Sequence, residues 1–192
     1  MIKMVVVLTI LSAASGFLLS MIKNSTAAQI EVQQLQFVKG PAIKNILDGA
    51  GNDPIADRFK IKDGEQEKSF FVGKFNGKAN SIAFEASGKG FAGDIGVMVG
   101  INIDDDKIIG AAVTTHSETP GLGANAKDKP DFTAQFKGLP AEGPVNVTGD
   151  GGKINAMAGA TITSRGVCAT VTKALEEYKK LKPQVQEEIK KF

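Results

Sequence analysis

The feature that most restricts this chain is an uncharged, largely apolar run of 19 residues, Met4–Ile22, bounded by Lys3 and Lys23. A helix of that length is roughly 28 Å long, which matches the hydrocarbon core of a bilayer. The run therefore predicts a membrane anchor helix over residues 1–26. Almost no chain precedes it, so we expect the rest of the protein on one side of a bacterial cell membrane. If the short basic end stays inside, that side is the outer face.

A cleaved signal peptide is the alternative interpretation of this run. Lys3 would be its basic end, and Ser25, Thr26 and Ala27 would form the cleavage region. Three observations favour a retained anchor: the run exceeds the usual apolar core of a signal peptide, Lys23 follows it at once, and a helical pattern continues after it. One lysine on each flank says little about orientation.

The rest of the chain changes from a helical to a strand pattern. Residues 27–57 predict a helical connector, interrupted at Gly40-Pro41 because proline resists an interior helix position. Short segments rich in Ile, Val and Phe follow up to His116, with hairpin-length connections that leave no room for crossover helices, so they predict an antiparallel meander. These segments are RFKIKD, KSFFVGKF, NSIAFEAS, DIGVMVGINI and KIIGAAVTTH.

A loop-dominated stretch then leads to a final helix. Apolar residues at three- and four-residue spacing predict a helix from about Thr163 to Lys182, which Pro183 ends or kinks. The predicted fold class is α+β: an N-terminal transmembrane helix, then an antiparallel β-meander domain with a C-terminal helix.

Cysteine and histidine counts limit the chemistry. Cys168 is the only cysteine, so no disulfide can form within the chain, and a small buried filler is the favoured interpretation of this residue. His116 is the only histidine, which makes a zinc site improbable. The 23 basic and 21 acidic residues form no stripe typical of nucleic-acid binding. Any redox chemistry must therefore come from an organic cofactor.

The segment Ala158–Ser164, AGATITS, suits an anchored phosphate. Small residues leave the backbone approachable, Thr161 offers an attachment oxygen, and Thr163 or Ser164 can cap the helix that follows. A helix N-terminus favours anions, and Arg165 in the first turn is sensible beside a phosphate. The alternative is an ordinary small-residue turn with a cap.

A second segment, HSETPGLGA, follows a predicted strand directly, at a sheet edge where loops often carry function. Pro120, Gly121 and Gly123 suggest a stiff loop against which a flat ring could lie. His116 and Glu118 could share a metal, but no third strong ligand is in view.

A third segment, Gly88–Gly93, has the pattern GxGxxG, which in dinucleotide-binding folds stands between a strand and a helix. Here a predicted strand follows, so we reject that interpretation. We expect a tight hairpin whose backbone approaches another element or a cofactor.

Together the blocks GKGFAGDIGVMVGINIDDDKIIG, HSETPGLGA and NAMAGATITSRGV resemble the covalent-FMN-binding domain family. They occur in the family's order, and with the anchor the resemblance covers nearly the whole chain. The family includes the RnfG subunits of Rnf electron-transport complexes and the related NqrC subunits of sodium-translocating NADH:quinone reductases, which tend to be longer. The length favours RnfG.

The resemblance implies that residues 58–192 form an FMN-binding domain. It also implies that a flavin transferase joins FMN through its phosphate to Thr161. It also implies an electron-transfer subunit of an ion-translocating ferredoxin:NAD oxidoreductase, partnered by other membrane and peripheral subunits and not catalytic alone. The expected cofactor-binding residues are Glu118, Thr119, Gly121, Leu122, Gly123, Gly159, Ala160, Thr163, Ser164 and Arg165. Glu118 is the charge expected to influence the flavin potential, and backbone N–H groups of residues 121–124 are expected near the ring.

Two positions depart from the family pattern, which usually has Asp at Asn155 and Ser or Thr at Ala158. Both lie on the stretch that a transferase would read. Tightly held non-covalent FMN is the resulting alternative. An NqrC-like subunit, a tethered binding module with no redox role, and a scaffold subunit with a decayed flavin site are also compatible with the sequence.

Overall fold

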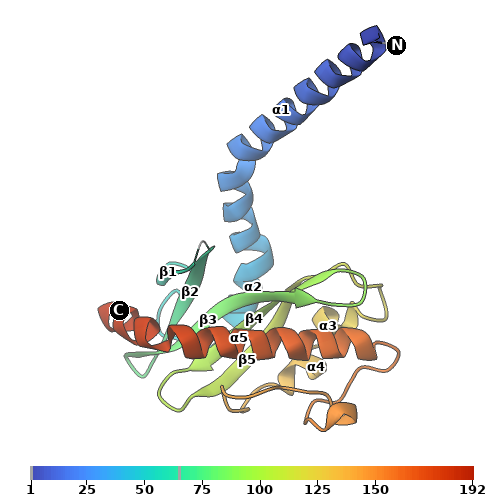
Figure 1. Ribbon diagram of the computed structural model, residues 1–192. Helices are drawn as coiled ribbons and strands as arrows, with labels where there is room; N and C mark the ends of the chain where they lie inside the picture. Colours follow the sequence, from blue (N-terminus) through green and yellow to red (C-terminus); the bar gives the residue numbers. More distant parts are fainter. Residues whose placement is uncertain (1, 65) are drawn as a thin grey trace. The chain divides into compact units, whose positions relative to one another are not determined.

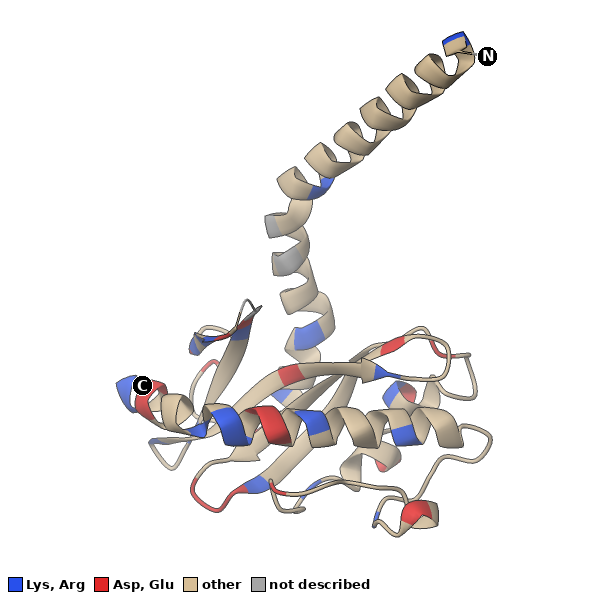
Figure 2. Cartoon of the chain, viewed as in Figure 1, with Lys and Arg blue, Asp and Glu red and all other residues tan. Residues whose placement is uncertain are grey.

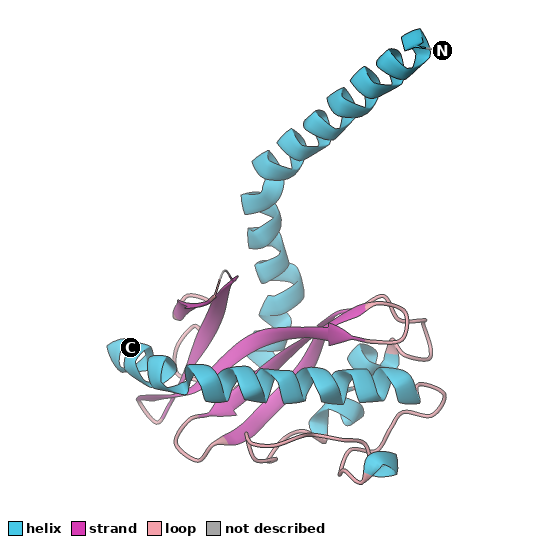
Figure 3. Cartoon of the chain, in the orientation of Figure 1, coloured by secondary structure: helices cyan, strands magenta, loops and turns pink. Residues whose placement is uncertain are grey.

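The computed structural model describes residues 2–64 and 66–192 and divides the chain into two compact units, Met1–Val38 and Lys39–Phe192. The first unit is helical (Figure 3). Helix α1 covers Ile2–Gln33, and its part Ile2–Ala27 is long and apolar enough to cross a membrane. Figure 2 shows the uncharged run as a tan stretch of this helix.

The helical connector differs in two ways from the sequence-based prediction. A π-helical segment, η1 (Gln34–Lys39), follows α1, and α2 (Gly40–Ile46) follows η1 without a gap. Gly40-Pro41 therefore does not interrupt the helical path. Pro41 lies in the first turn of α2, where a missing N–H costs no helical hydrogen bond. Residues 27–57 are divided between the two units.

The second unit contains the predicted antiparallel meander. Its strands are β1 (Arg58–Asp63), β2 (Gln66–Phe75), β3 (Lys78–Lys89), β4 (Asp94–Asn102) and β5 (Lys107–Thr115). They lie side by side in sequence order, and each pairs antiparallel with the next. Asn76 and Gly77 between β2 and β3 both have positive φ, as a two-residue hairpin turn requires.

Helix α5 (Thr161–Glu188) covers one face of the sheet, and Figure 1 shows it lying across the strands. Short helices α3 (Asn125–Asp128) and α4 (Pro130–Ala134) pack beside β5 and add Ala126 and Phe132 to the same core. Helix α2 packs on the opposite face, where its Ile46 lies over Gly100 of β4. Side chains alternate between the two faces of a strand. Because α5 covers one face of β4 and α2 covers the other, nearly every position of β4 is buried.

Helix α5 is longer than predicted at both ends. It begins at Thr161, two residues before the predicted start, and it continues past Pro183 to Glu188. An interior proline costs about 3 kcal/mol or more. The apolar stripe nevertheless continues beyond it, since Val185 and the following Ile189 are buried in the same core. Packing on both sides of Pro183 therefore overrides its tendency to end the helix.

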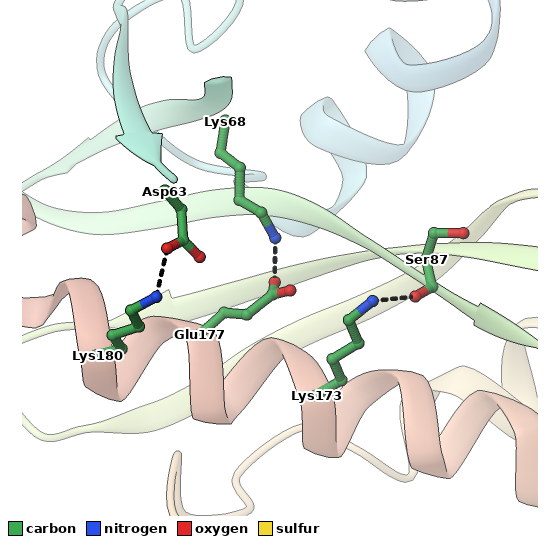
Figure 4. A network of polar contacts seen from close by, with 6 residues as sticks. All are labelled: Asp63, Lys68, Ser87, Lys173, Glu177 and Lys180. Carbon is green, nitrogen blue, oxygen red and sulfur yellow. Dashed lines mark hydrogen bonds and ion pairs between the residues drawn. The ribbon is translucent and has the colours of Figure 1, made fainter. Parts of the chain in front are cut away.

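Polar side chains also hold α5 on the sheet, as Figure 4 shows. Lys68 of β2 pairs with Glu177. Asp63 at the end of β1 lies 2.5 Å from the ammonium of Lys180. Lys173 donates a hydrogen bond of 2.9 Å to the carbonyl of Ser87 in β3. These contacts lie along the middle and the C-terminal half of the helix, whereas its N-terminus has a different set of partners.

Candidate functional site

The N-terminus of α5 presents Thr161 to solvent. Thr161 is the first helical residue and is exposed. Over residues 2–64 and 66–192, its hydroxyl has no hydrogen-bond partner. The preceding residue, Ala160, has no side chain that could cap the helix. The first backbone N–H groups of a helix have no partners within it, so this end can bind an anion.

The expected capping role of Thr163 and Ser164 is wrong, because the helix begins before them. The Thr163 hydroxyl instead donates a hydrogen bond of 2.6 Å to Oε2 of Glu118. The Ser164 hydroxyl donates to the carbonyl of Ala160 at 2.9 Å and accepts the N–H of Met157 at 3.0 Å. Both residues are buried, so they shape the turn from beneath while Thr161 remains free.

The loop predicted to form a ring wall packs against this turn. Gly159 has φ of +73°, a conformation that L side chains rarely adopt, and a Cβ there would lie 3.2 Å from Cδ2 of Leu122. The N–H groups of Leu122 and Ala124 both donate to the carbonyl of Thr119, at 3.2 Å and 3.1 Å. These two N–H groups are therefore already used within the loop. This corrects the expectation that the whole run from residue 121 to 124 offers free donors.

Gly121 and Gly123 of the loop are each required for a different structural reason. Gly121 has φ of +75° and makes the turn of the loop possible. Asn125 secures that turn by donating a side-chain hydrogen bond of 2.9 Å to the Gly121 carbonyl. Gly123 is buried, and a Cβ there would fall 2.7 Å from the Thr163 hydroxyl, so the loop and α5 are in direct contact.

Glu118 is buried, with a residue exposure of 5%. Its Oε1 accepts the backbone N–H groups of Phe91 at 2.8 Å and of Ala92 at 3.0 Å, while Oε2 accepts the Thr163 hydroxyl. The carboxylate thus joins the β3–β4 hairpin, its own loop and α5. We expected it as a charge beside a ring, whereas the structure shows both of its oxygens bonded to protein.

The Glu118 carboxyl is ionised at neutral pH despite its burial. Burial alone would raise the pKa of Glu118. The hydrogen bonds from Thr163, Ala92 and Phe91, together with His116 nearby, outweigh burial and hold the pKa below its usual value. A buried carboxylate that accepts three hydrogen bonds is stable as the charged form.

The hairpin glycines lie close to other elements, as predicted. A Cβ on Gly90 would fall 2.3 Å from Oε1 of Glu118, and a Cβ on Gly88 would fall 2.1 Å from the Thr170 hydroxyl of α5. A strand, β4, follows this segment, so the rejection of a dinucleotide-binding fingerprint is confirmed. On the α5 side of the contact between this hairpin and the helix, a Cβ on Gly166 would fall 2.4 Å from the Lys89 carbonyl oxygen.

Arg165 does not lie free beside the helix N-terminus. Its Nε and one terminal nitrogen contact the two carboxylate oxygens of Asp150 at 2.6 Å and 2.7 Å. The pair is exposed, and Asp150 belongs to the short helix η2 (Thr148–Asp150). Asp150 is thus a partner of Arg165 that the sequence did not reveal.

Three large apolar side chains are exposed on the segments that meet at this helix end. Phe91 is 67% exposed, Leu122 is 48% exposed and Ile162 is 54% exposed. Over the described residues of the second unit, Phe192 is the only other large hydrophobic side chain that is exposed. Leu122 adjoins Gly159, Ile162 follows Thr161, and Phe91 stands on the hairpin bonded to Glu118. We call Phe91, Leu122 and Ile162 the apolar rim.

The rim and the free hydroxyl together suit a ligand with a flat apolar part and a phosphate. The rim offers contact area to a ring, and Thr161 with the adjacent N–H groups offers a place for the phosphate. Leu122 was predicted from the sequence. Phe91 was missed, because the sequence predicted its hairpin but not that its side chain is left exposed beside the other two segments.

Other candidate residues have simpler roles. Nδ1 of His116 accepts the N–H of Glu118 at 3.2 Å, and no group of three metal-binding side chains occurs in the part of the chain that the structure describes. Cys168 is buried, and burial, aided by Asp150, raises its pKa to about 11, so its thiol stays protonated. Asn155 and Ala158 are both exposed.

Known proteins similar to this chain point to one family. A family model for the FMN-binding domain matches residues 90–176, which include the turn between β3 and β4, the loop and the first half of α5. The G subunit of the ion-translocating oxidoreductase complex of Methanosarcina acetivorans is 32% identical over 91% of this chain and 92% of its own length. The G subunit of the proton-translocating ferredoxin:NAD(+) oxidoreductase complex of Clostridium ljungdahlii is 32% identical over 88% of this chain and 87% of its own length.

Two solved structures share the fold. The C subunit of the Na(+)-translocating NADH-quinone reductase from Parabacteroides distasonis superposes with a TM-score of 0.53 and 28% identity, over 60% of this chain and 63% of that one. NqrC of Shewanella oneidensis superposes with a TM-score of 0.54 over 72% of each chain, at 24% identity.

The fold and the site therefore define an FMN-binding domain of the type shared by these redox-complex subunits. Within that class, the chain belongs to the RnfG family, the G subunits of ion-translocating oxidoreductase complexes.

Proposed function

We propose that this protein carries one FMN, joined through its phosphate to Thr161, and transfers electrons within an Rnf-type ion-translocating ferredoxin:NAD oxidoreductase complex. α1 anchors it in a bacterial cell membrane, with the second unit on the outer face. Other membrane and peripheral subunits of the complex are its partners, and a flavin transferase matures it. The observation that carries the proposal is the free, exposed hydroxyl of Thr161 at a helix N-terminus without a side-chain cap.

The attachment is a group transfer that exchanges no electrons. Oγ1 of Thr161 forms a bond to the phosphorus of a flavin nucleotide whose phosphate is activated as an anhydride. The anhydride bond to the leaving group breaks, and the hydroxyl proton is released. Thr161 is a suitable acceptor because its hydroxyl is exposed to a maturation enzyme. The exposed Asn155 and Ala158 precede Thr161 on the stretch that we expect such an enzyme to read.

The protein itself retains the flavin and provides the environment of its ring. A flavin supplies electron transfer, and the chain supplies binding and electrostatics around it. The ester at Thr161 leaves the ring's electronic structure unchanged, so neighbouring residues set its potential. Of the expected binding residues, Thr119 shapes the loop, Gly121, Gly123, Gly159 and Ala160 allow close approach, and Leu122 contacts the ring. Thr163 and Ser164 support the turn from below, and Arg165 acts together with Asp150.

The test is flavin attachment to the full-length chain expressed with its transferase. We expect an intact mass higher by one FMN less one water and a fluorescent band on a denaturing gel. Thr161→Ala abolishes both, whereas Thr161→Ser, which keeps a hydroxyl, retains them. Thr148→Ala is the matched control, because Thr148 is also exposed and its hydroxyl makes no hydrogen bond to any described residue. Equal fluorescence in wild type and Thr161→Ala would reject the attachment site.

The alternatives give different results in the same experiment. Flavin that is lost on denaturation of wild type but present in native protein indicates non-covalent FMN. A colourless native protein indicates a tethered binding module with no redox role. A complex whose electron transfer is unchanged by Thr161→Ala indicates a scaffold subunit.

An NqrC-like role is the second candidate, supported by the superposition on the Parabacteroides distasonis protein. It is less favoured, because the chain covers 92% of the G subunit of Methanosarcina acetivorans but 63% of that reductase protein. Purification of the native complex decides between the two, since only an Rnf-type complex oxidises ferredoxin.

A further inference from the structure

The space around the Glu118 carboxylate is shaped to hold it. A Cβ on Gly90 would fall 2.3 Å from Oε1, and a Cβ on Gly123 would fall 2.4 Å from Oε2. Real Cβ atoms essentially never come within 3.0 Å of another heavy atom. Glycine on both sides therefore leaves room for a charged group that would otherwise be too large for the interior.

The carboxylate connects three segments close to Thr161: the hairpin, the loop and α5. Through Oε1 it fixes the hairpin backbone at Phe91 and Ala92, and through Oε2 it fixes α5 at Thr163, two residues after Thr161. Its own residue is the start of the loop that brings Leu122 against Gly159. Loss of this one side chain would remove the bonds that tie the hairpin and the start of the loop to α5.

Glu118 offers little to a bound ring directly, because three of the roughly four acceptor positions of its carboxylate are already occupied. It has only acceptor atoms when ionised, both oxygens are engaged, and 5% of the residue is exposed. Its charge nevertheless remains close to the helix end, where the partial positive charge of the helix N-terminus stabilises an anion. Any effect on a ligand must pass through the groups it positions or through its electric field.

We infer that Glu118 is the positioning residue of the flavin site. It holds the hairpin, the loop and the first turn of α5 in the arrangement that receives the ring, and its buried negative charge disfavours the addition of electrons to that ring. The inference rests on the proposed function, because it requires a flavin at Thr161.

A glutamine at position 118 has nearly the same shape as glutamate but no charge, so it tests the effect of the charge separately. In Glu118→Gln the amide oxygen still accepts the two hairpin N–H groups. The Thr163 hydroxyl can rotate to accept the amide N–H₂ in place of donating. The fold is therefore expected to survive, while the negative charge is lost. A residue with a merely structural role would then leave the flavin potential unchanged.

The experiment measures the reduction potential and visible spectrum of the flavin in full-length, flavinylated protein in detergent. We expect Glu118→Gln to shift the potential to a more positive value and to change the flavin absorption bands. Glu85→Gln is the matched control, because Glu85 also accepts a threonine hydroxyl, from Thr114, and pairs with Lys39 at 2.7 Å. Its side chain lies on the opposite face of the sheet, and we expect no shift.

A second pair of variants keeps the inference testable if Glu118→Gln does not fold. Thr163→Val removes the bond to Oε2 but keeps the charge, and Thr163→Ser restores the bond. We expect altered absorption bands in the valine variant and wild-type bands in the serine variant. Wild-type potential and spectrum in Glu118→Gln, or in Thr163→Val if only that variant folds, would overturn the inference and leave the proposed function intact. Wild type that carries no flavin at Thr161 overturns both.

Discussion

The close contact between Gly166 and the β3–β4 hairpin predicts the outcome of Gly166→Ala. Gly166 is buried in the second turn of α5, and a Cβ there would lie 2.4 Å from the Lys89 carbonyl oxygen and 3.1 Å from Cα of Gly90. To restore a separation of 3.0 Å, the helix or the hairpin must withdraw by about 0.6 Å. The opposing atoms belong to the backbone, so no flexible side chain can move aside.

The magnitude follows from two opposing effects. Alanine is favoured over glycine in a helix interior by about 1 kcal/mol. Overpacking a close contact costs about 1–3 kcal/mol, and here the backbone contact places the cost in the upper part of that range. We therefore expect Gly166→Ala to lower the free energy of unfolding by about 1–2 kcal/mol. For a protein of this size that corresponds to a melting temperature lower by about 2–8 °C.

The assay is thermal unfolding of the full-length protein in detergent, followed by circular dichroism. Gly149→Ala is the control, because a Cβ at Gly149 meets nothing within 4 Å. We expect the control to lie within about 0.5 kcal/mol of wild type. If Gly166→Ala matches or exceeds wild-type stability, the described packing of α5 on the hairpin is wrong.

Two further predictions concern buried polar groups. Tyr178 is 2% exposed and donates a hydrogen bond of 2.8 Å to Asp106, so Tyr178→Phe should lower the unfolding free energy by about 1–2 kcal/mol in urea titrations; no change would show that the bond contributes nothing. The pKa of Glu118 is lower in the folded protein than in the unfolded chain, so its contribution is present above the unfolded value of about 4.3 and is lost as the pH falls through the folded value. Melting temperatures measured between pH 7 and pH 3 should therefore decrease less steeply in Glu118→Gln than in wild type; parallel curves would contradict the assigned hydrogen bonds.

Local patterns predicted most of the secondary structure. Short β-rich segments with hairpin-length connections predicted the meander, and Asn76-Gly77 forms one of these connections as a tight turn. The apolar spacing of the last helix predicted its buried side. Such features depend on neighbouring residues, so the order of amino acids is enough to reveal them. The ends of α5 were less accurate, because packing of Val185 and Ile189 outweighs the local effect of Pro183.

The family motifs similarly predicted Thr161 and its surroundings as the candidate site. The fold brings the GATITS turn, the ETPGLG loop and the GxGxxG hairpin together at one end of α5. The close approach of the hairpin backbone to another element was expected, whereas the exposure of Phe91 as part of the apolar rim was not. Exposure of a single side chain depends on what the rest of the chain covers.

The sequence by itself determined the strands of the meander, the course of the last helix, the apolar run that can span a membrane, and Thr161 as the candidate attachment residue. Only the tertiary structure decided which partner each polar group takes. Glu118 bonds Phe91 from 27 residues away and Thr163 from 45 residues away, while Arg165 pairs with Asp150 on another element. No local spacing encodes such pairs, because the fold brings distant residues together and burial then requires each polar group to find a partner.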